Sequence, residues 1–264
     1  MLVTGASSGI GEATARRLAR SGWRVYAGVR NVGDAPAGTE EFVLDVTDGE
    51  QIAAAAARVD ELHALVNNAG VAVAAPLEVI PLEELRRQLE INVLGQVAVT
   101  QAFLPQLRLA RGRIVFMGSI AGRSSLPFLG PYAASKHALE AIADALRVEL
   151  APWSMQVAIV EPGTIATPIW AKGAATADAI QSRTSADSLA LYRDRVEAFR
   201  RAAAERGRRG QPADRVARAV EHALTASRPK TRYLVGRDAK LRATFERLPD
   251  RLRDRVYERL LLRS

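Results

Sequence analysis

Short apolar runs alternate with longer segments of helical spacing along most of this chain, and this alternation constrains its fold more than any other feature. The predicted strands are Leu2–Thr4, Arg24–Val29, Glu41–Leu44, Ala64–Asn67, Arg113–Met117, Val157–Val160 and Arg232–Val235. The predicted helices between them include Glu12–Ser21, Gln51–Leu62, Glu84–Leu109 and Tyr132–Leu150. Strands separated by helices of this length need βαβ crossovers, which place the strands parallel in one sheet.

The apolar strands indicate a sheet that is covered on both faces. The run Ile114–Phe116 is continuously apolar, as expected where helices bury both sides of a parallel strand. We see no internal repeat and no Pro/Gly/Ser-rich linker that would divide the 264 residues. The sequence therefore predicts one α/β domain over residues 1–264, a doubly wound (Rossmann-type), seven-stranded parallel sheet with helices on both faces.

The charge is strongly basic, with a formal net charge of +8. Of 37 basic residues only four are lysine, and the arginines are spread along the chain. Their densest group, Arg193–Arg218, alternates with Asp194, Glu197, Glu205 and Asp214, which is typical of a solvated helical face. We therefore expect no nucleic-acid partner.

Several other classes of protein are excluded or disfavoured by what the sequence contains. There is no cysteine, which excludes disulfides and thiolate catalysis, and His63, His137 and His222 lack the spacing of metal ligands. No secretory signal is visible, and no run approaches the ~20 apolar residues that a membrane-spanning helix needs. We expect a cytoplasmic protein with no metal and no integral membrane segment.

A glycine-rich turn, Thr4-Gly5-Ala6-Ser7-Ser8-Gly9-Ile10-Gly11, lies between the first predicted strand and the first helix. Glycines in this context allow a tight turn and let the backbone approach a pyrophosphate, whose charge the helix N-terminus stabilises. An alternative is that Gly5–Gly9 forms the G-x-S-x-G elbow of a serine hydrolase, with Ser7 as nucleophile and His222 as a partner. Such an elbow normally follows several strands, whereas only one short strand precedes this turn.

Three motifs together are similar to those of the short-chain dehydrogenase/reductase family. They are the glycine-rich turn, Asn67-Asn68-Ala69-Gly70 and Tyr132-Ala133-Ala134-Ser135-Lys136, and they occur in the order and spacing of that family. The resemblance extends from Leu2 to about Gly236. It implies an oxidoreductase that moves hydride between a nicotinamide cofactor and a carbonyl or secondary alcohol.

The catalytic residues implied by this resemblance are Asn92, Ser119, Tyr132 and Lys136. Tyr132 and Lys136 are four residues apart on a predicted helix and share one face. A nearby ammonium favours the phenolate, so we expect Lys136 to lower the pKa of Tyr132, which then acts as acid or base. Ser119 follows a predicted strand, and in the family a serine there hydrogen-bonds the reacting oxygen. Asn92 corresponds to the family residue that holds a water beside the lysine.

The resemblance also implies a set of cofactor contacts. Asn68-Ala69-Gly70 runs beneath the adenosine ribose, and Asp45, with Val46 beside it, contacts the adenine. Ile165 and Thr167, in the segment that begins with Pro162-Gly163, contact the nicotinamide. The full predicted cofactor set is Gly5, Ser7, Ser8, Gly9, Ile10, Gly11, Arg30, Asp45, Val46, Asn68, Ala69, Gly70, Tyr132, Lys136, Pro162, Gly163, Ile165 and Thr167.

The end of the second predicted strand indicates which nicotinamide cofactor is bound. Enzymes that use NAD place an acidic residue there, but this chain has Val29-Arg30-Asn31 and no acid before Asp34. The Arg30 guanidinium, with Ser7 or Ser8, would pair well with a ribose 2′-phosphate. We predict NADP(H) rather than NAD(H). A non-catalytic NADP-binding sensor of the same fold is an alternative, although all four catalytic residues are present.

The remaining regions bear on substrate and assembly. Residues 170–210 are the least regular and are predicted to form a substrate lid. Apolar residues near Ser119, and the local similarity of Glu161–Trp170 to hydroxysteroid, retinol and 3-hydroxybutyrate dehydrogenases, suggest a lipophilic steroid-, retinoid- or keto-lipid-like substrate. The amphipathic tail 240–264 carries the stripe Leu241, Phe245, Leu248, Leu252, Val256 and Leu260. We expect it to dock on its own domain or on a partner subunit rather than on a membrane. The resemblance implies a homodimer or homotetramer.

Overall fold

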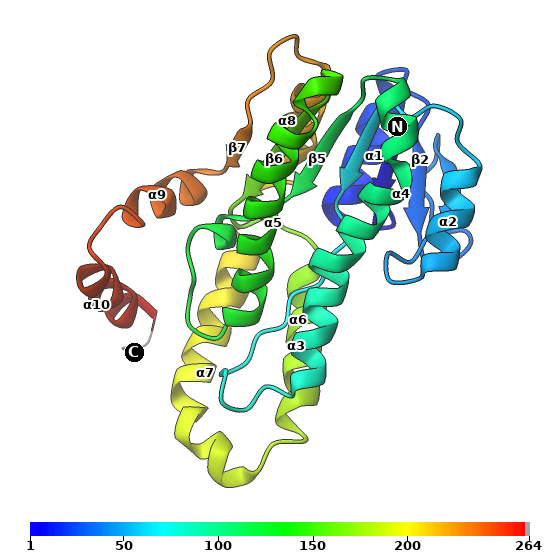
Figure 1. Cartoon of the computed structure of the whole chain (residues 1–264). Helices are drawn as coiled ribbons and strands as arrows, with labels where there is room; N and C mark the ends of the chain where they lie inside the picture. The colour runs from blue at the N-terminus through cyan, green and yellow to red at the C-terminus, as the bar shows by residue number, and fades with distance from the viewer. Residues whose placement is uncertain (262–264) are drawn as a thin grey trace.

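The structure is a computed structural model that describes residues 1–261, apart from the side chains of residues 206, 260 and 261. Seven strands form one parallel sheet in the order β3-β2-β1-β4-β5-β6-β7 (Figure 1). The strands are β1 (Leu2–Thr4), β2 (Tyr26–Val29), β3 (Glu40–Val43), β4 (Ala64–Asn67), β5 (Arg113–Met117), β6 (Gln156–Pro162) and β7 (Arg232–Val235). The order reverses between β1 and β4, so the predicted doubly wound, single-domain α/β fold is confirmed.

The helices are close to the predicted ones, with one important difference. They are α1 (Gly9–Arg20), α2 (Gly49–Ala57), α3 (Leu82–Leu89), α4 (Gly95–Leu109), α5 (Gly130–Glu149), α6 (Ile169–Gln181), α7 (Ala186–Arg208), α8 (Asp214–Thr225), α9 (Arg237–Phe245) and α10 (Asp250–Leu261). The single helix predicted over Glu84–Leu109 is in fact α3 and α4 joined by one π-helical turn, η1 (Glu90–Leu94). Such wider turns are rare and often lie at functional sites.

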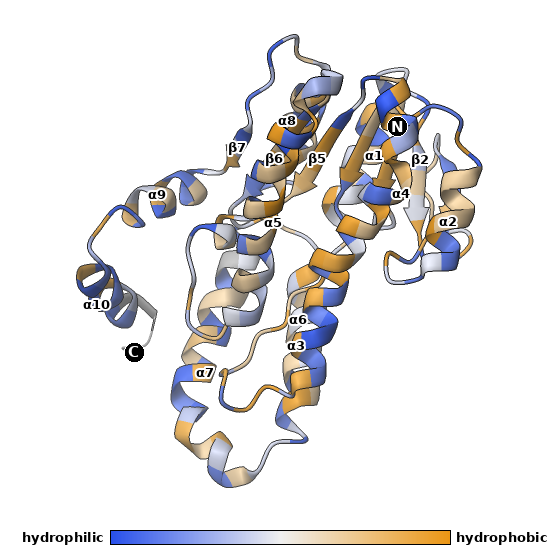
Figure 2. Cartoon of the chain, in the orientation of Figure 1, coloured by the Kyte–Doolittle hydropathy of each residue, from blue (hydrophilic) through white to orange (hydrophobic). Residues whose placement is uncertain are grey.

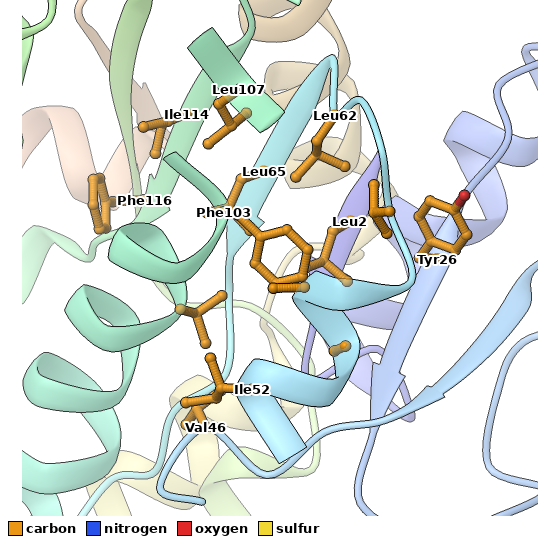
Figure 3. Close-up of a cluster of buried hydrophobic side chains, with 14 of the residues drawn as sticks. Leu2, Tyr26, Val46, Ile52, Leu62, Leu65, Phe103, Leu107, Ile114 and Phe116 are labelled. Carbon is orange, nitrogen blue, oxygen red and sulfur yellow. The ribbon is translucent and has the colours of Figure 1, made fainter. Parts of the chain in front are cut away.

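Strand side chains alternate between two hydrophobic clusters, one on each face of the sheet. On one face Leu2, Leu65 and Ile114 pack with residues of α2, α4 and α5, and Figure 3 shows Phe103 and Leu107 of α4 among them. On the other face Val3 and Val66 pack with residues of α1 and α8. This two-residue period, with both faces buried, explains why the strands are continuously apolar. Figure 2 accordingly shows β5 in hydrophobic colours.

The region 170–210 is more regular than predicted. It consists mostly of α6 and α7, which form a helical hairpin (Figure 1), whereas the sequence marks 170–210 as the least regular part of the chain. The hairpin is tied to the domain at several points. The rings of Phe128 and Phe199 meet edge to face with their centroids 5.5 Å apart, and Tyr192 hydrogen-bonds Glu78.

The C-terminal tail is two helices, because the chain breaks helical geometry at 246–249 between α9 and α10. Helix α9 contacts β7 and the short 3₁₀ turn η2 (Ile120–Gly122), and α10 contacts α7. The predicted apolar stripe is only partly buried, since Leu241 and Leu252 are exposed, and the Leu260 side chain lies outside the described residues. Within the described residues, no helix is long and apolar enough to span a membrane.

Candidate active site

A cleft of about 390 Å³ runs along the carboxyl ends of the strands. Six strands place a predicted residue in it at the point where each strand ends, as doubly wound sheets do at their ligand sites. All but two of the predicted site residues line this cleft, namely Gly5, Ser7, Ser8, Gly9, Ile10, Arg30, Asp45, Val46, Asn68, Ala69, Gly70, Ser119, Tyr132, Lys136, Pro162, Gly163, Ile165 and Thr167. Gly11 and Asn92 are not among the lining residues.

The glycine-rich turn has the shape of an anion cradle. Gly5 and Gly9 both have φ of +62°, a left-handed conformation that residues with a side chain rarely adopt. Ser8 precedes α1 without capping it through its side chain, so the start of this helix can serve a pyrophosphate. Gly11 acts through packing instead, because a Cβ there would lie 2.2 Å from the Gly5 carbonyl oxygen.

A second turn is fastened to the first by Thr4 and Asn68. The Thr4 hydroxyl oxygen accepts hydrogen bonds from the backbone N–H groups of Asn68 and Ala69, both at 3.0 Å. In return the Asn68 amide donates to the carbonyl oxygens of Thr4, at 2.9 Å, and Gly5, at 3.2 Å. The ends of β1 and β4 therefore form one rigid floor for the cleft.

Arg30 and Asp45 lie at the far end of the cleft, after β2 and β3 respectively. Arg30 is exposed and lines the cleft, whereas Asp34 does not line it and accepts a hydrogen bond from the Asn31 side chain. The Asp45 carboxylate is oriented by Thr47, whose backbone N–H and hydroxyl donate to it at 2.9 and 2.8 Å. This end of the cleft thus carries an exposed cation, Arg30, and an oriented carboxylate, Asp45.

The opposite end of the cleft brings together Ser119, Tyr132 and Lys136. Ser119 begins η2 just after β5, and its side chain lies close enough to the Tyr132 phenol of α5 to favour the ionised phenol. Lys136 lies one turn further along α5, with its ammonium nitrogen 5.7 Å from the centre of the Tyr132 ring. That nitrogen donates a 2.7 Å hydrogen bond to the Met117 carbonyl oxygen. A phenol, a hydroxyl and an ammonium therefore meet at one point.

The expectation that Lys136 lowers the pKa of Tyr132 is wrong for this structure. Burial raises the pKa of the Tyr132 phenol, and the groups that oppose the rise are Ser119 and Arg242. Burial likewise lowers the pKa of Lys136, to about 8, because the surroundings disfavour its charged form. The cost of desolvating the charged form of Tyr132 therefore outweighs the attraction to Lys136 that the sequence suggested.

Asn92 is fully buried in the π-helical turn, which excludes a solvent-facing position for it. Its side chain accepts from the Val71 backbone N–H at 2.8 Å, and donates to the Val71 carbonyl and the Ser135 hydroxyl, both at 3.0 Å. Asn92 therefore fastens the loop after β4 to the helix that carries Tyr132 and Lys136. The structure does not bring its side chain into the cleft.

The segment after β6 is held against the glycine-rich turn by residues that the sequence analysis missed. A Cβ on Gly9 would touch the Thr167 side chain at 3.3 Å, so the two segments pack closely. The Thr164 backbone N–H donates to the Asp238 carboxylate at 2.6 Å, and Trp170 donates to the Ile165 carbonyl at 2.8 Å. No local motif marks Asp238, which lies far along the chain.

Other lining residues were also missed, above all Arg242 of α9, together with Leu129, Lys172 and Gly173. The serine hydrolase alternative requires His222 as the partner of Ser7. His222 lies on α8 and its Nδ1 instead hydrogen-bonds the Tyr233 hydroxyl at 2.9 Å. Among the residues that the structure describes, no histidine lines the cleft beside Ser7.

Comparisons with known proteins agree with this geometry. A family model described as short chain dehydrogenase matches residues 1–178. The NADPH-dependent 3-dehydrocapnine reductase of Ornithobacterium rhinotracheale is 34% identical, over 97% of this chain and 95% of that protein. Retinol dehydrogenase 16 of Homo sapiens is 37% identical, over 91% of this chain and 81% of that protein.

A solved structure shows the same architecture over nearly the whole chain. It is a short chain dehydrogenase from Burkholderia cenocepacia J2315 in complex with NADP, with a TM-score of 0.76, 27% identity and coverage of 98% of this chain and 96% of that one. Fold, family model and relatives all lead to one assignment. The chain belongs to the short-chain dehydrogenase/reductase family of oxidoreductases.

Proposed function

We propose that this oxidoreductase is NADP(H)-dependent and interconverts a carbonyl and a secondary alcohol, with Tyr132 as the acid/base. The observation that carries the proposal is the convergence of Ser119, Tyr132 and Lys136 in the cleft that begins at the glycine-rich turn. The left-handed glycines at 5 and 9 and the uncapped start of α1 fit a dinucleotide pyrophosphate. When bound, the nicotinamide supplies or accepts the hydride.

The protein's own residues then handle the oxygen and the proton. Ser119 holds the reacting oxygen beside the Tyr132 hydroxyl, which donates a proton to a carbonyl oxygen or accepts one from an alcohol. Lys136 supplies positive charge beneath the ring, and its bond to Met117 fixes the position of that charge. Asn92 holds the active-site helix in place through Ser135.

The choice of NADP(H) over NAD(H) rests on Arg30. Its guanidinium lines the cleft after β2, where NAD-dependent enzymes carry an acid. A 2′-phosphate would accept charge-assisted hydrogen bonds from Arg30, and Ser7 and Ser8 line the same cleft. The names of one relative and one solved structure, which mention NADPH and NADP, support this choice.

A lipophilic substrate and a helical lid are part of the same proposal. Leu129, Pro168, Ile169 and Trp170 line the cleft and provide apolar surface. Lys172, Gly173 and Thr176 of α6 also line it, so the α6–α7 hairpin is placed to cover a bound substrate.

We further propose a homodimer or homotetramer, which the exposed apolar side chains Leu109 of α4 and Val148 of α5 support. Sedimentation velocity of the purified protein tests the assembly, and a monomer at micromolar concentration would contradict it.

The test of function is NADPH oxidation, followed at 340 nm, with a panel of steroid, retinoid and keto-lipid carbonyl compounds. We expect turnover with at least one apolar ketone and a lower kcat/KM with NADH. NADPH binding is measured separately, by the change in protein fluorescence. Binding without turnover would favour the non-catalytic sensor, and a failure to bind either nicotinamide would refute the proposal.

A further inference from the structure

The loop that follows β4 is held by side-chain amides. Residues 71–75 belong to no helix or strand, and we call this segment the strap. The fully buried Gln88 of α3 donates to the Val71 carbonyl oxygen at 2.6 Å and accepts from the Val73 backbone N–H at 2.8 Å. Asn92, four residues later, binds both the N–H and the carbonyl of Val71. The two amides therefore satisfy backbone groups that an irregular segment would otherwise leave unpaired.

The strap is in close contact with α6. A Cβ on the buried Gly173 of α6 would lie 2.9 Å from the Ala72 carbonyl oxygen, so only glycine allows this approach. Four buried apolar side chains extend the contact, namely Val73 and Ala75 of the strap together with Ile80 and Ile180. Ala72 follows β4 and Gly173 follows β6, and both line the cleft. Because β5 lies between these strands, the strap and α6 bridge the cleft.

The second helix of the hairpin, α7, is tied to the strap through Phe128. The Ala75 backbone N–H donates to the Phe128 carbonyl oxygen at 3.0 Å, and the Phe128 ring meets the Phe199 ring of α7 edge to face. Phe128 has a φ of +66°, a left-handed conformation that a bulky residue keeps only where its surroundings impose it. Both helices of the hairpin therefore depend on the position of the strap.

The bridge adjoins the proposed cofactor site. The strap begins directly after Gly70, and α6 begins two residues after Thr167, and both of these residues belong to the predicted cofactor set. A dinucleotide that extends from Arg30 to Tyr132 would pass beneath the contact between Ala72 and Gly173. It could then leave the cleft only when the strap and α6 separate.

We infer that Gln88 is a positioning residue, which with Asn92 fixes the strap so that the strap holds α6 closed over the bound nicotinamide cofactor. Among the described residues Gln88 does not line the cleft, so it acts through the strap and not on the ligand. The enclosure of a cofactor rests on the proposed function. The dependence of α6 on Gln88 can be measured in the protein without any ligand.

The first experiment is hydrogen–deuterium exchange, measured by mass spectrometry without cofactor, on the natural chain, Gln88→Met and the control Gln106→Met. Methionine keeps the length of the side chain but removes its hydrogen bonds. Gln106 is the matched control because it also donates to a backbone carbonyl, that of Ala56 at 3.0 Å, and does not line the cleft. We expect peptides of the strap and of α6 to exchange about tenfold faster in Gln88→Met, because each net hydrogen bond changes an equilibrium roughly two- to tenfold. Peptides of α1 and α8 report global unfolding and should not change, and α6 should be unaffected in Gln106→Met.

The second experiment measures the rate constant for NADPH release by stopped-flow fluorescence, with excess NADP to prevent rebinding. We expect Gln88→Met to raise this rate constant about tenfold, because the strap no longer fixes α6. Gly173→Ala should raise it as well, since the added Cβ forces α6 away from the Ala72 carbonyl. Both substitutions act on one contact, so the double variant should release NADPH about as fast as the faster single variant, whereas independent effects would multiply.

The outcomes separate the two proposals. Exchange of α6 that is unchanged in Gln88→Met or equally fast in Gln106→Met, NADPH release that is unaltered, or rate constants that multiply in the double variant would each overturn the role of Gln88. If the protein binds neither nicotinamide while α6 exchange still depends on Gln88, the positioning of α6 stands and the proposed function fails. Should Gln88→Met not fold, as judged by circular dichroism, Gln88→Asn is used instead, because its shorter amide cannot reach both Val71 and Val73. Exchange of α6 as in the natural chain would then contradict the inference.

Discussion

The ammonium nitrogen of Lys136 donates a 2.7 Å hydrogen bond to the backbone carbonyl oxygen of Met117, at the end of β5. This contact ties α5 to the strand that leads to Ser119, and so fixes both halves of the candidate catalytic group. The lysine is only 4% exposed, and its burial lowers its pKa to about 8. The position therefore costs stability whenever the ammonium is protonated, and that cost depends on pH.

The first prediction concerns this pH dependence. The pKa of Lys136 is lower in the folded than in the unfolded chain, so the unfolded chain binds more protons between pH 8 and 10.5. Stability should therefore rise with pH across this window. The free energy of unfolding of the natural chain, measured with urea, should increase between pH 7.5 and pH 9.5. In Lys136→Met this increase should be about 2 kcal/mol smaller. The same increase in both proteins would show that Lys136 is not the group that titrates.

Replacing Tyr132 tests its proposed role as the general acid or base. Tyr132→Phe removes the hydroxyl that lies beside Ser119 but keeps the half-buried ring. We expect kcat for ketone reduction to fall about 10²–10⁴-fold, the usual contribution of a positioned acid or base. The affinity for NADPH, measured by fluorescence, should change by less than about threefold, because the glycine-rich turn and Arg30 lie at the other end of the cleft. Tyr233→Phe, outside the cleft and the α6–α7 hairpin, is the control and should keep its activity.

Arg30 should decide between the two nicotinamide cofactors. In Arg30→Ala a 2′-phosphate loses its charge-assisted hydrogen bonds, so we expect the KM for NADPH to rise about 10- to 100-fold. The KM for NADH should change little, because NADH lacks that phosphate. Arg20→Ala removes the same charge at an exposed position that does not line the cleft, and it should alter neither KM. A rise in both KM values for Arg30→Ala would place the guanidinium elsewhere on the cofactor.

Much of the cleft could be predicted because its residues directly follow strands. A continuously apolar run such as Ile114–Phe116 reveals a buried parallel strand, and what comes after it must lie at the sheet's carboxyl edge. The glycine-rich turn was found in this way, and the end of the strand placed Ser119, whose catalytic role the family resemblance implied. The family motifs then identified Tyr132 and Lys136 of α5 as further site residues. These predictions depend on short stretches of sequence in which neighbours along the chain are also neighbours in space.

The remaining residues could not be predicted because they depend on contacts between distant segments. Arg242 is one arginine among many, and only the packing of α9 on β7 and η2 turns it toward the cleft. Nothing in Glu90–Leu94 breaks a helical pattern, yet a π turn forms there and lets Asn92 bond the backbone of Val71. The direction of the Tyr132 pKa likewise depends on the depth of burial, which local spacing does not give.

A chain of ionisable groups continues along α5 beneath the candidate active site. Glu140 lies one turn beyond Lys136 and close to the carboxyl group of Glu161, which is fully buried and paired with Arg123. Burial, followed by the nearby Glu161, raises the pKa of Glu140 to about 7, although Arg232, at 3.0 Å, opposes the rise. Two carboxyl groups so close favour holding one proton between them.

The last prediction follows from that shared proton. Because the pKa of Glu140 is higher in the folded chain, the folded chain binds more protons between about pH 4.5 and pH 7, and stability falls as pH rises through this window. Glu140→Gln keeps a neutral hydrogen-bond donor toward Glu161 at every pH, so this fall should disappear. Urea unfolding at pH 5 and pH 8 measures this fall, with Glu149→Gln, exposed on the same helix, as the control.

The Met1 ammonium also contributes to the pH dependence, because its lowered pKa, about 6, makes stability rise with pH above that value. This contribution is common to the natural chain and both variants, so it cancels in the comparison. If Glu140→Gln and the natural chain show the same dependence on pH, Glu140 is ionised throughout and the two carboxyl groups share no proton.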